Sequence, residues 1–124
     1  MGNRAMGHVA LLDGDSVNAV GSATTPSAGQ AIATIAAANL PAGKYKVSAM
    51  PGYGGTAGAI NDMQVKKGAT VVGGLSVQAT TNTSFARQDF DQVTLDGASA
   101  LTVNAVAGGA GVYAAVVTAT KLPD

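Results

Sequence analysis

Residues 90–122 contain three strand-like runs, and this pattern constrains the fold more than any other feature of the chain. Apolar residues recur at every second position in residues 91–95 and again in 101–105, the period of a strand with one buried face. Residues 112–120 are apolar on both faces at their centre, which predicts an interior strand. We therefore expect three consecutive strands, with the rest of the chain packed against them.

Asp96 and Gly97 follow the first of these strands and predict a hairpin to the second. A two-residue turn would pair Leu95 with Ala98 and would place Leu101 on the face opposite Val93. A three-residue loop with Gly97 in the left-handed conformation keeps both alternating patterns in phase, so we predict that geometry. A second glycine-rich turn at residues 107–111 leads into the third strand.

The composition favours an all-β fold. The chain has no glutamate and no tryptophan, and the residues that usually coat exposed helices are scarce. Residues 31–39 have helical propensity because they are rich in alanine, but their alternation favours a strand. Turn residues separate the strand candidates, which are residues 9–12, 31–37, 44–50, 60–66, 69–77, 87–95, 99–106 and 112–121. We predict a single-domain antiparallel β-sandwich, jelly-roll-like, with about eight strands.

Residues 1–30 differ in composition from the rest. They are rich in Gly, Ser, Ala, Thr and Asn and contain two short apolar segments. We expect an extended N-terminal arm over residues 1–30, partly strand-like, followed by the sandwich domain over residues 31–124. Residues 51–58 and 79–84 are predicted loops, which either connect strands or contact a partner.

Charge and cysteine content exclude several classes of protein. The chain has no cysteine, so disulfides and thiolate metal sites are excluded. Seven basic and seven acidic residues give a net charge of zero, and no basic field exists to attract nucleic acid or an anionic membrane. No apolar run approaches the length of a membrane span. We expect a soluble protein without nucleic-acid or membrane partners.

Motifs of catalysis and cofactor binding are incomplete. Residues 52–57 have the spacing of a dinucleotide fingerprint, but further glycine follows where a helix is required. Residues 13–18 offer oxygens like a calcium loop, yet Val17 occupies a ligand position and no glutamate is present. His8, the single histidine, lies in the arm, and the chain has no Gly-x-Ser-x-Gly elbow. We predict no enzyme, no cofactor and no metal site.

Two sets of side chains are candidates for contacts instead. Arg87, Asp89 and Asp91 alternate along one predicted strand and point to the same side. Two carboxylates could do acid and base work, but an arginine beside them favours an ion-paired edge or an intersubunit contact. Tyr53, within the glycine-rich loop, could stack on a sugar or a partner protein.

Three segments, residues 40–47, 95–99 and 111–122, together resemble the small β-rich decoration, or cement, proteins of tailed-bacteriophage heads. The resemblance covers residues 30–122 and consists of a similar composition and a similar order of segments. It implies a jelly-roll subunit that assembles as a homotrimer on the outer capsid surface and links neighbouring major capsid proteins. It also implies a place in the virion, with assembly in the host cytoplasm.

On this interpretation the arm and the strand edges make the contacts, because few charges need to be desolvated there. The predicted partner-binding residues are Val9, Leu11, Leu12, Val17, Val20, Tyr53, Arg87, Asp89 and Asp91. The alternative function is a carbohydrate-binding jelly-roll module or adhesin that uses Tyr53 and the loop near Asn82. A third class, a small hydrolase, depends on His8 and the aspartates.

Overall fold

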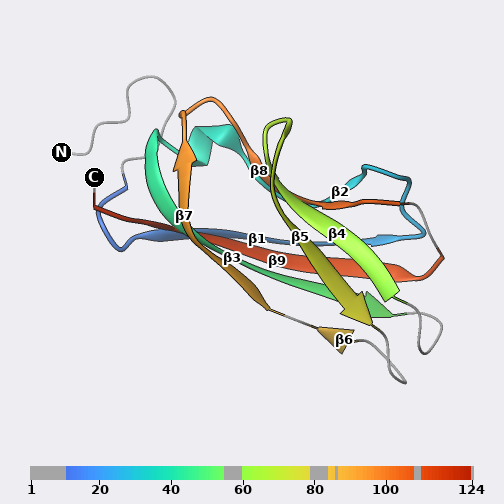
Figure 1. Ribbon diagram of the computed structural model, residues 1–124. Helices are drawn as coiled ribbons and strands as arrows, with labels where there is room; N and C mark the ends of the chain where they lie inside the picture. The colour runs from blue at the N-terminus through green and yellow to red at the C-terminus, as the bar shows by residue number, and fades with distance from the viewer. Residues whose placement is uncertain (1–10, 55–59, 79–83, 86, 108–109, 124) are drawn as a thin grey trace.

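The computed structural model describes residues 11–54, 60–78, 84–85, 87–107 and 110–123. These residues form an all-β sandwich with a single 3₁₀ turn, as predicted (Figure 1). The elements are β1 (Ser16–Thr24), β2 (Ala31–Ile35), the turn η2 (Ala37–Asn39), β3 (Gly43–Gly54), β4 (Ile60–Lys67), β5 (Thr70–Gln78), β6 (Ser84–Phe85), β7 (Gln88–Leu95), β8 (Leu101–Ala105) and β9 (Val112–Lys121).

The strands form two antiparallel sheets. One, the front sheet, has the order β1-β9-β3, and β6 and β7 both pair with the remaining edge of β3. β7 pairs with the first half of β3 and β6 with Gly52 and Tyr53, so the two segments together occupy one strand position. The other, the back sheet, has the order β2-β8-β4-β5. Each sheet is therefore four strands wide, which confirms the prediction of about eight strands.

The pairing of the strands is that of a jelly roll. β1 pairs with β9, β2 with β8, β3 with β7 and β4 with β5. The first half of the chain thus pairs with the second half in reverse order, as in one long hairpin. Gly68, at a φ of 57°, forms the tip of that hairpin, where Lys67 pairs with Thr70. Further pairing of β9 with β3 and of β8 with β4 rolls the ribbon into two sheets.

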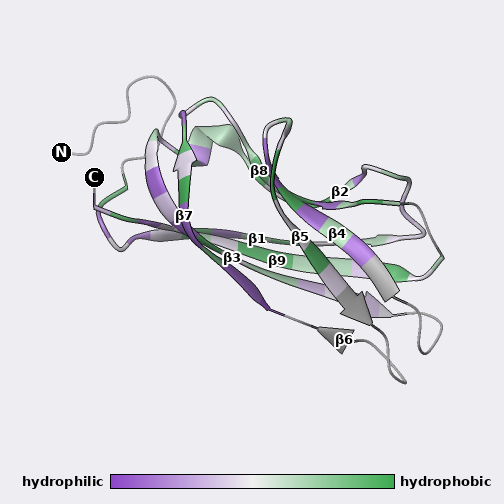
Figure 2. Ribbon diagram, in the orientation of Figure 1, coloured by the Kyte–Doolittle hydropathy of each residue, from purple (hydrophilic) through white to green (hydrophobic). Residues whose placement is uncertain are grey.

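The core lies between the sheets and follows the predicted alternation. In β9 every second side chain is buried, and in β8 Leu101, Val103 and Ala105 are buried while the residues between them are partly exposed. Full burial of one such aliphatic side chain is worth about 1.5–3 kcal/mol. Figure 2 shows the hydrophobic centre of β9, which lies between β1 and β3 as an interior strand should. The largest fully buried side chains are Tyr45, Tyr113, Leu40, Met63 and Leu101.

The predicted hairpin between residues 91–95 and 101–105 is wrong. β7 belongs to the front sheet and β8 to the back sheet, so the chain crosses from one sheet to the other between them. Gly97 does adopt the left-handed conformation, at a φ of 82°, and Asp96 Oδ1 accepts a hydrogen bond from the Ala98 amide at 2.9 Å. The turn therefore forms a corner between sheets. Alternation specifies which side chains are buried, and both arrangements bury the same ones.

The N-terminal segment contributes a strand at a different place from the one predicted. Leu11 and Leu12, part of the strand predicted at residues 9–12, are outside any strand, and Val9 lies outside the described residues. The strand is β1 instead, which pairs with β9 over nine residues. Part of the predicted arm thus belongs to the front sheet. The division of the chain at residue 30 stays a prediction.

Two loop predictions also change. β3 continues to Gly54, so the loop predicted at residues 51–58 is wrong over its first four residues, and residues 55–58 lie outside the described part of the chain. Ser84, from the loop predicted at residues 79–84, belongs to β6. The strand favoured in residues 31–39 is confirmed for β2, and the 3₁₀ turn follows it. Within the described residues, no helix is long and apolar enough to span a membrane.

Candidate protein-binding face

The outward surface of the front sheet is the candidate functional site, and we call it the binding face. The registers of β1, β9 and β3 align their outward side chains in rows across the three strands. One row is apolar and two are polar, and the rows are Val20, Val116, Met50; Asn18, Thr118, Ser48; and Ser16, Thr120, Lys46. A groove of about 300 Å³ runs over β3 and β9 on this face and reaches Arg87.

The apolar row is accessible. Val20 is 74% exposed and Met50 is 37% exposed, while Val116 between them is half-buried. Val112, further along β9 on the same side, is 47% exposed. These aliphatic side chains therefore lie exposed on one face of the front sheet.

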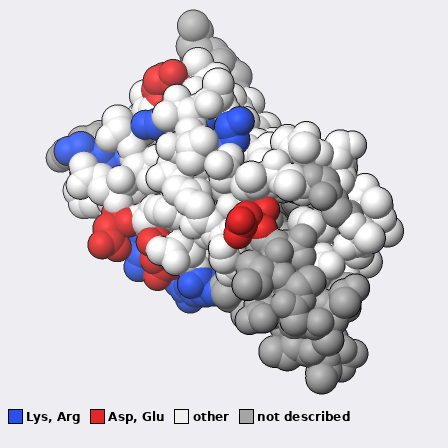
Figure 3. Space-filling model, turned by 45° about the vertical axis from the view of Figure 1, so that its right-hand side comes forward, with Lys and Arg blue, Asp and Glu red and all other residues white. Residues whose placement is uncertain are grey.

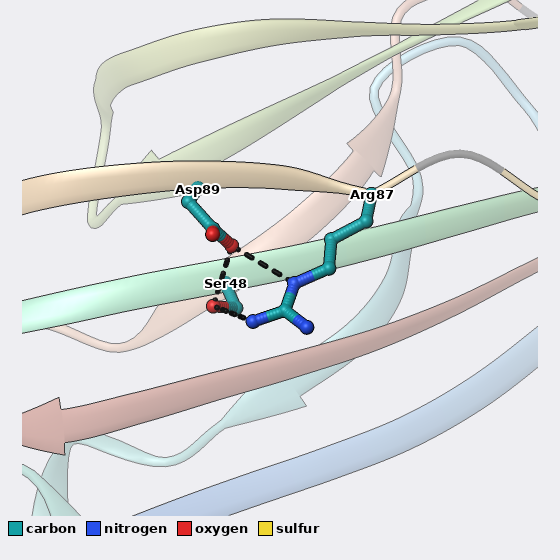
Figure 4. Close-up of polar contacts among 3 residues, drawn as sticks. All are labelled: Ser48, Arg87 and Asp89. Atoms are coloured by element: carbon teal, nitrogen blue, oxygen red, sulfur yellow. Dashed lines mark hydrogen bonds and ion pairs between the residues drawn. The ribbon is translucent and has the colours of Figure 1, made fainter.

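A polar cluster borders the groove where β3 meets β7 (Figure 4). Ser48 Oγ lies 2.7 Å from Asp89 Oδ1, to which it donates, and Arg87 Nε donates to the same oxygen at 3.0 Å. Arg87 Nη2 lies 3.3 Å from Ser48 Oγ and donates to it. The hydrogen bond from Ser48, followed by that from Arg87, lowers the pKa of Asp89. Asp89 is therefore held as a carboxylate, which fixes the direction of the guanidinium.

Asp89 precedes a β-bulge in β7 and Asp91 lies within it, although the sequence pattern places both side chains on one side of the strand. Val47 pairs with Phe90 and Tyr45 with Val93, so β7 has one residue more than β3 between these pairs. This β-bulge ends the simple alternation just beyond Asp89. The ion pair in the structure joins Arg87 to Asp89, which is the contact that the sequence indicated for those two residues.

The arm residues predicted to bind a partner are divided by the structure. Leu11 and Val17 are half-buried and pack against the core, so their side chains stabilise the sandwich. Leu12 is 73% exposed, and Val20 lies in the apolar row of the binding face. Val9 lies outside the described residues. The structure therefore brings Val20 onto the same face as Arg87 and Asp89, and it turns Leu11 and Val17 inward.

Tyr53 is not at the surface. Its side chain is 4% exposed, its hydroxyl donates to the Ala110 carbonyl at 2.9 Å, and its ring meets that of Tyr113 edge-on with centroids 5.2 Å apart. The predicted contact requires an exposed Tyr53. This prediction is wrong, because Tyr53 lies in β3 with its ring pointing into the sandwich.

The central residues of the face, Met50, Val116 and Thr118, are not among those predicted from the sequence. They are the outward members of strands whose positions were predicted correctly. The signal was available in the same alternation, since the residues between buried positions must point outward. Which outward residues would become neighbours depends on strand pairing, which the alternation does not contain.

Charged side chains are sparse and form small separate groups on the side of the molecule seen in Figure 3. In the part of the chain that the structure describes, no three His, Cys, Asp or Glu residues are placed to hold a metal ion. His8, on which a hydrolase would depend, lies outside that part.

Comparison with known proteins supports the fold. Neither a protein-family model nor a curated protein sequence matches the chain. Among solved structures, the PRD1 vertex protein P5 is 13% identical over 86% of this chain and 96% of its own, with a TM-score of 0.50. A Podospora anserina GH26-CBM35 β-(1,4)-mannanase is 16% identical over 91% of this chain, with a TM-score of 0.48, and the chain spans 29% of its length. The Tobacco streak virus coat protein is 15% identical, with 88% and 86% coverage and a TM-score of 0.31.

Proposed function

We propose that this chain is a structural virion protein that binds the outer surface of a bacteriophage capsid, as a homotrimer, and cements neighbouring major capsid proteins. The jelly-roll arrangement supports this role, because it is a fold of viral capsid proteins as well as of lectins. The PRD1 vertex protein, a virion component by its name, has a similar fold.

The observation that carries the proposal is the composition of the binding face. Its centre is the apolar row of Val20, Val116 and Met50, and the neighbouring row presents hydroxyl and amide groups, while Lys46 lies in the row beyond. A partner can therefore cover the centre of this face with little desolvation of charge, the property that separates the core of a protein interface from ordinary surface.

The mechanism needs no reacting group. Each copy that binds the assembled shell, and not its separated subunits, stabilises the shell by mass action. A homotrimer multiplies this effect, because its second and third contacts are made at a high effective concentration. The Arg87 and Asp89 pair, at the rim of the groove, is placed to orient the partner and contributes little affinity of its own at its exposure.

Two measurements test the proposal. Quantitative peptide mass spectrometry of purified particles should find this chain at an abundance comparable to the major capsid protein. In co-sedimentation with capsids that lack the chain, Met50→Lys should weaken binding at least tenfold, because it puts a charge at the centre of the apolar row. Val71→Lys is the matched control: Val71 is 49% exposed but lies on β5 of the back sheet.

Other outcomes would decide against the proposal. Absence of the chain from particles would exclude the capsid role, and equal capsid binding by both variants would exclude the binding face as the contact surface. The carbohydrate-binding alternative no longer has an exposed Tyr53 to support it, and a glycan array tests it directly. Specific binding to one glycan class, together with absence from particles, would establish that alternative.

A further inference from the structure

The sandwich formed by the described residues has four edges, and three of them carry a β-bulge. β2, β5 and β7 each have a register shift within the ladder that joins them to their neighbour. Bulges twist and interrupt an edge strand, and they are a common device by which proteins prevent edges from pairing with other chains. β7 is further protected by the charged side chains of Arg87, Asp89 and Asp91 beside or within it.

β1 is the fourth edge, and it lacks these protections. It pairs with β9 over nine residues without a register shift. Its sequence, SVNAVGSAT, contains no charged residue and no proline. In the part of the chain that the structure describes, β9 is its one hydrogen-bonded neighbour. A long, regular and uncharged edge of this kind is a template for another strand.

The hydrogen bonds at the two ends of β1 show which residues face the free edge. The Lys121 amide donates to the Asp15 carbonyl, and the Thr25 amide donates to the Gly111 carbonyl, so odd-numbered residues bond to β9. Because an antiparallel ladder alternates, the even-numbered residues direct their amide and carbonyl groups away from β9. These are Ser16, Asn18, Val20, Ser22 and Thr24, and their side chains are the exposed ones on the binding face.

We propose that β1 pairs antiparallel with β1 of a second copy of this chain, about a two-fold axis at Val20. In this register Val20 meets Val20 of the other copy, Asn18 meets Ser22 and Ser16 meets Thr24. All five outward residues then occupy hydrogen-bonded positions, which gives about ten backbone hydrogen bonds, two for each. The two binding faces join into one continuous sheet surface.

The side chains of β1 suit pairing with itself. About Val20 the outward side of the strand is nearly symmetric, with Ser and Thr at its ends and Asn and Ser next. The row at the axis joins two Val20 side chains, each 74% exposed in the single chain, and the outer rows pair neutral hydrogen-bonding groups. No like charges meet across the axis, so two copies do not repel each other there.

A cross-linking experiment tests the register, because the chain has no cysteine of its own. In the proposed pairing the two Val20 Cα atoms lie about 5.5 Å apart, within the range that a disulfide spans. Val20→Cys should therefore form a disulfide-linked dimer under mild oxidation. Thr24→Cys should not, since its two copies lie about 27 Å apart in this register. A mixture of Ser16→Cys and Thr24→Cys should form the mixed dimer that neither forms alone.

A charge at the axis tests whether the pairing drives association in solution. By sedimentation velocity of the isolated protein, Val20→Lys should have half the mass of the wild type at concentrations where the wild type is associated. Val112→Lys is the control, because Val112 is also an exposed valine of the binding face but lies on β9. Its mass should equal that of the wild type. Circular dichroism establishes that each variant is folded.

A wild type with the same mass as Val20→Lys at every concentration would overturn the proposal, as would efficient cross-linking of Thr24→Cys. The contact is two-fold and differs from the three-fold assembly of the proposed function. Since both experiments use the isolated protein, their failure would leave the capsid role to its own tests.

Discussion

Gly73 of the back sheet lies directly beneath the ring of Phe90 of the front sheet: a Cβ atom on Gly73 would come within 2.3 Å of Phe90 Cε1. The ring thus fills the volume that a side chain at residue 73 would need. Phe90 lies next to the β-bulge of β7, and Gly73 lies next to the β-bulge of β5. Two bulged edge strands therefore meet at this contact. The pair closes the sandwich on the side opposite β1 and β2.

Gly73→Ala should destabilise the fold by about 1–2 kcal/mol, because the Phe90 ring must move away from its packed position. Gly74→Ala is the neighbouring control: no atom lies within 4 Å of the Cβ position at Gly74. Urea unfolding followed by circular dichroism measures both. If the double variant with Phe90→Ala showed additive losses, the two residues would not be coupled and the contact would be unimportant.

Gly21→Ala should be more damaging than Gly73→Ala. A Cβ atom on Gly21 would lie 1.9 Å from the Ile32 carbonyl oxygen, a backbone atom of β2 that cannot rotate away as a ring can. We expect a loss of about 3 kcal/mol or more, with β1 displaced from β2. Hydrogen exchange of the β1 amides measures the displacement. Protection of these amides equal to the wild type would show that β2 accommodates the methyl group.

Stability should fall at alkaline pH because of Tyr113. Burial, followed by the neighbouring Tyr53, raises the pKa of Tyr113 above its ordinary value of 10.0. The neutral phenol is therefore favoured by folding, so its contribution is complete below pH 10.0 and is lost as the pH rises through the folded-state pKa. Urea unfolding between pH 8 and 11.5 should show this fall, which Tyr113→Phe should reduce. An unchanged fall in that variant would assign it to other groups.

Replacing either Ser48 or Arg87 should raise the pKa of Asp89. The hydrogen bond from Ser48 is the largest single cause of the lowered pKa, and Arg87 contributes both a hydrogen bond and its charge, so Ser48→Ala and Arg87→Gln should each raise the pKa toward 3.8. A carboxylate with a lowered pKa supports the fold above its unfolded-state pKa, and this support is lost as the pH falls through the folded-state value. NMR titration of the Asp89 side chain in both variants measures the two changes. An unchanged pKa in either variant would show that the replaced side chain does not stabilise the carboxylate.

The sequence by itself determined the buried face of each regular strand, since Val93, Leu95, Leu101 and Val103 are buried as the alternation requires. It also determined the left-handed turn at Gly97, because that conformation depends on neighbouring residues alone. For the candidate site it identified Arg87 and Asp89 as partners, two residues apart on one strand.

Only the tertiary structure decided which strands became neighbours. It placed β7 and β8 in different sheets, made residues 16–24 an edge strand and carried Tyr53 into the core. It also brought Ser48 to the Arg87 and Asp89 pair across β3 and β7. The physical reason is that a period of two fixes the face of a strand, whereas its partner is chosen by packing and hydrogen bonds between segments far apart in the sequence. The binding face and the open edge of β1 are products of that choice.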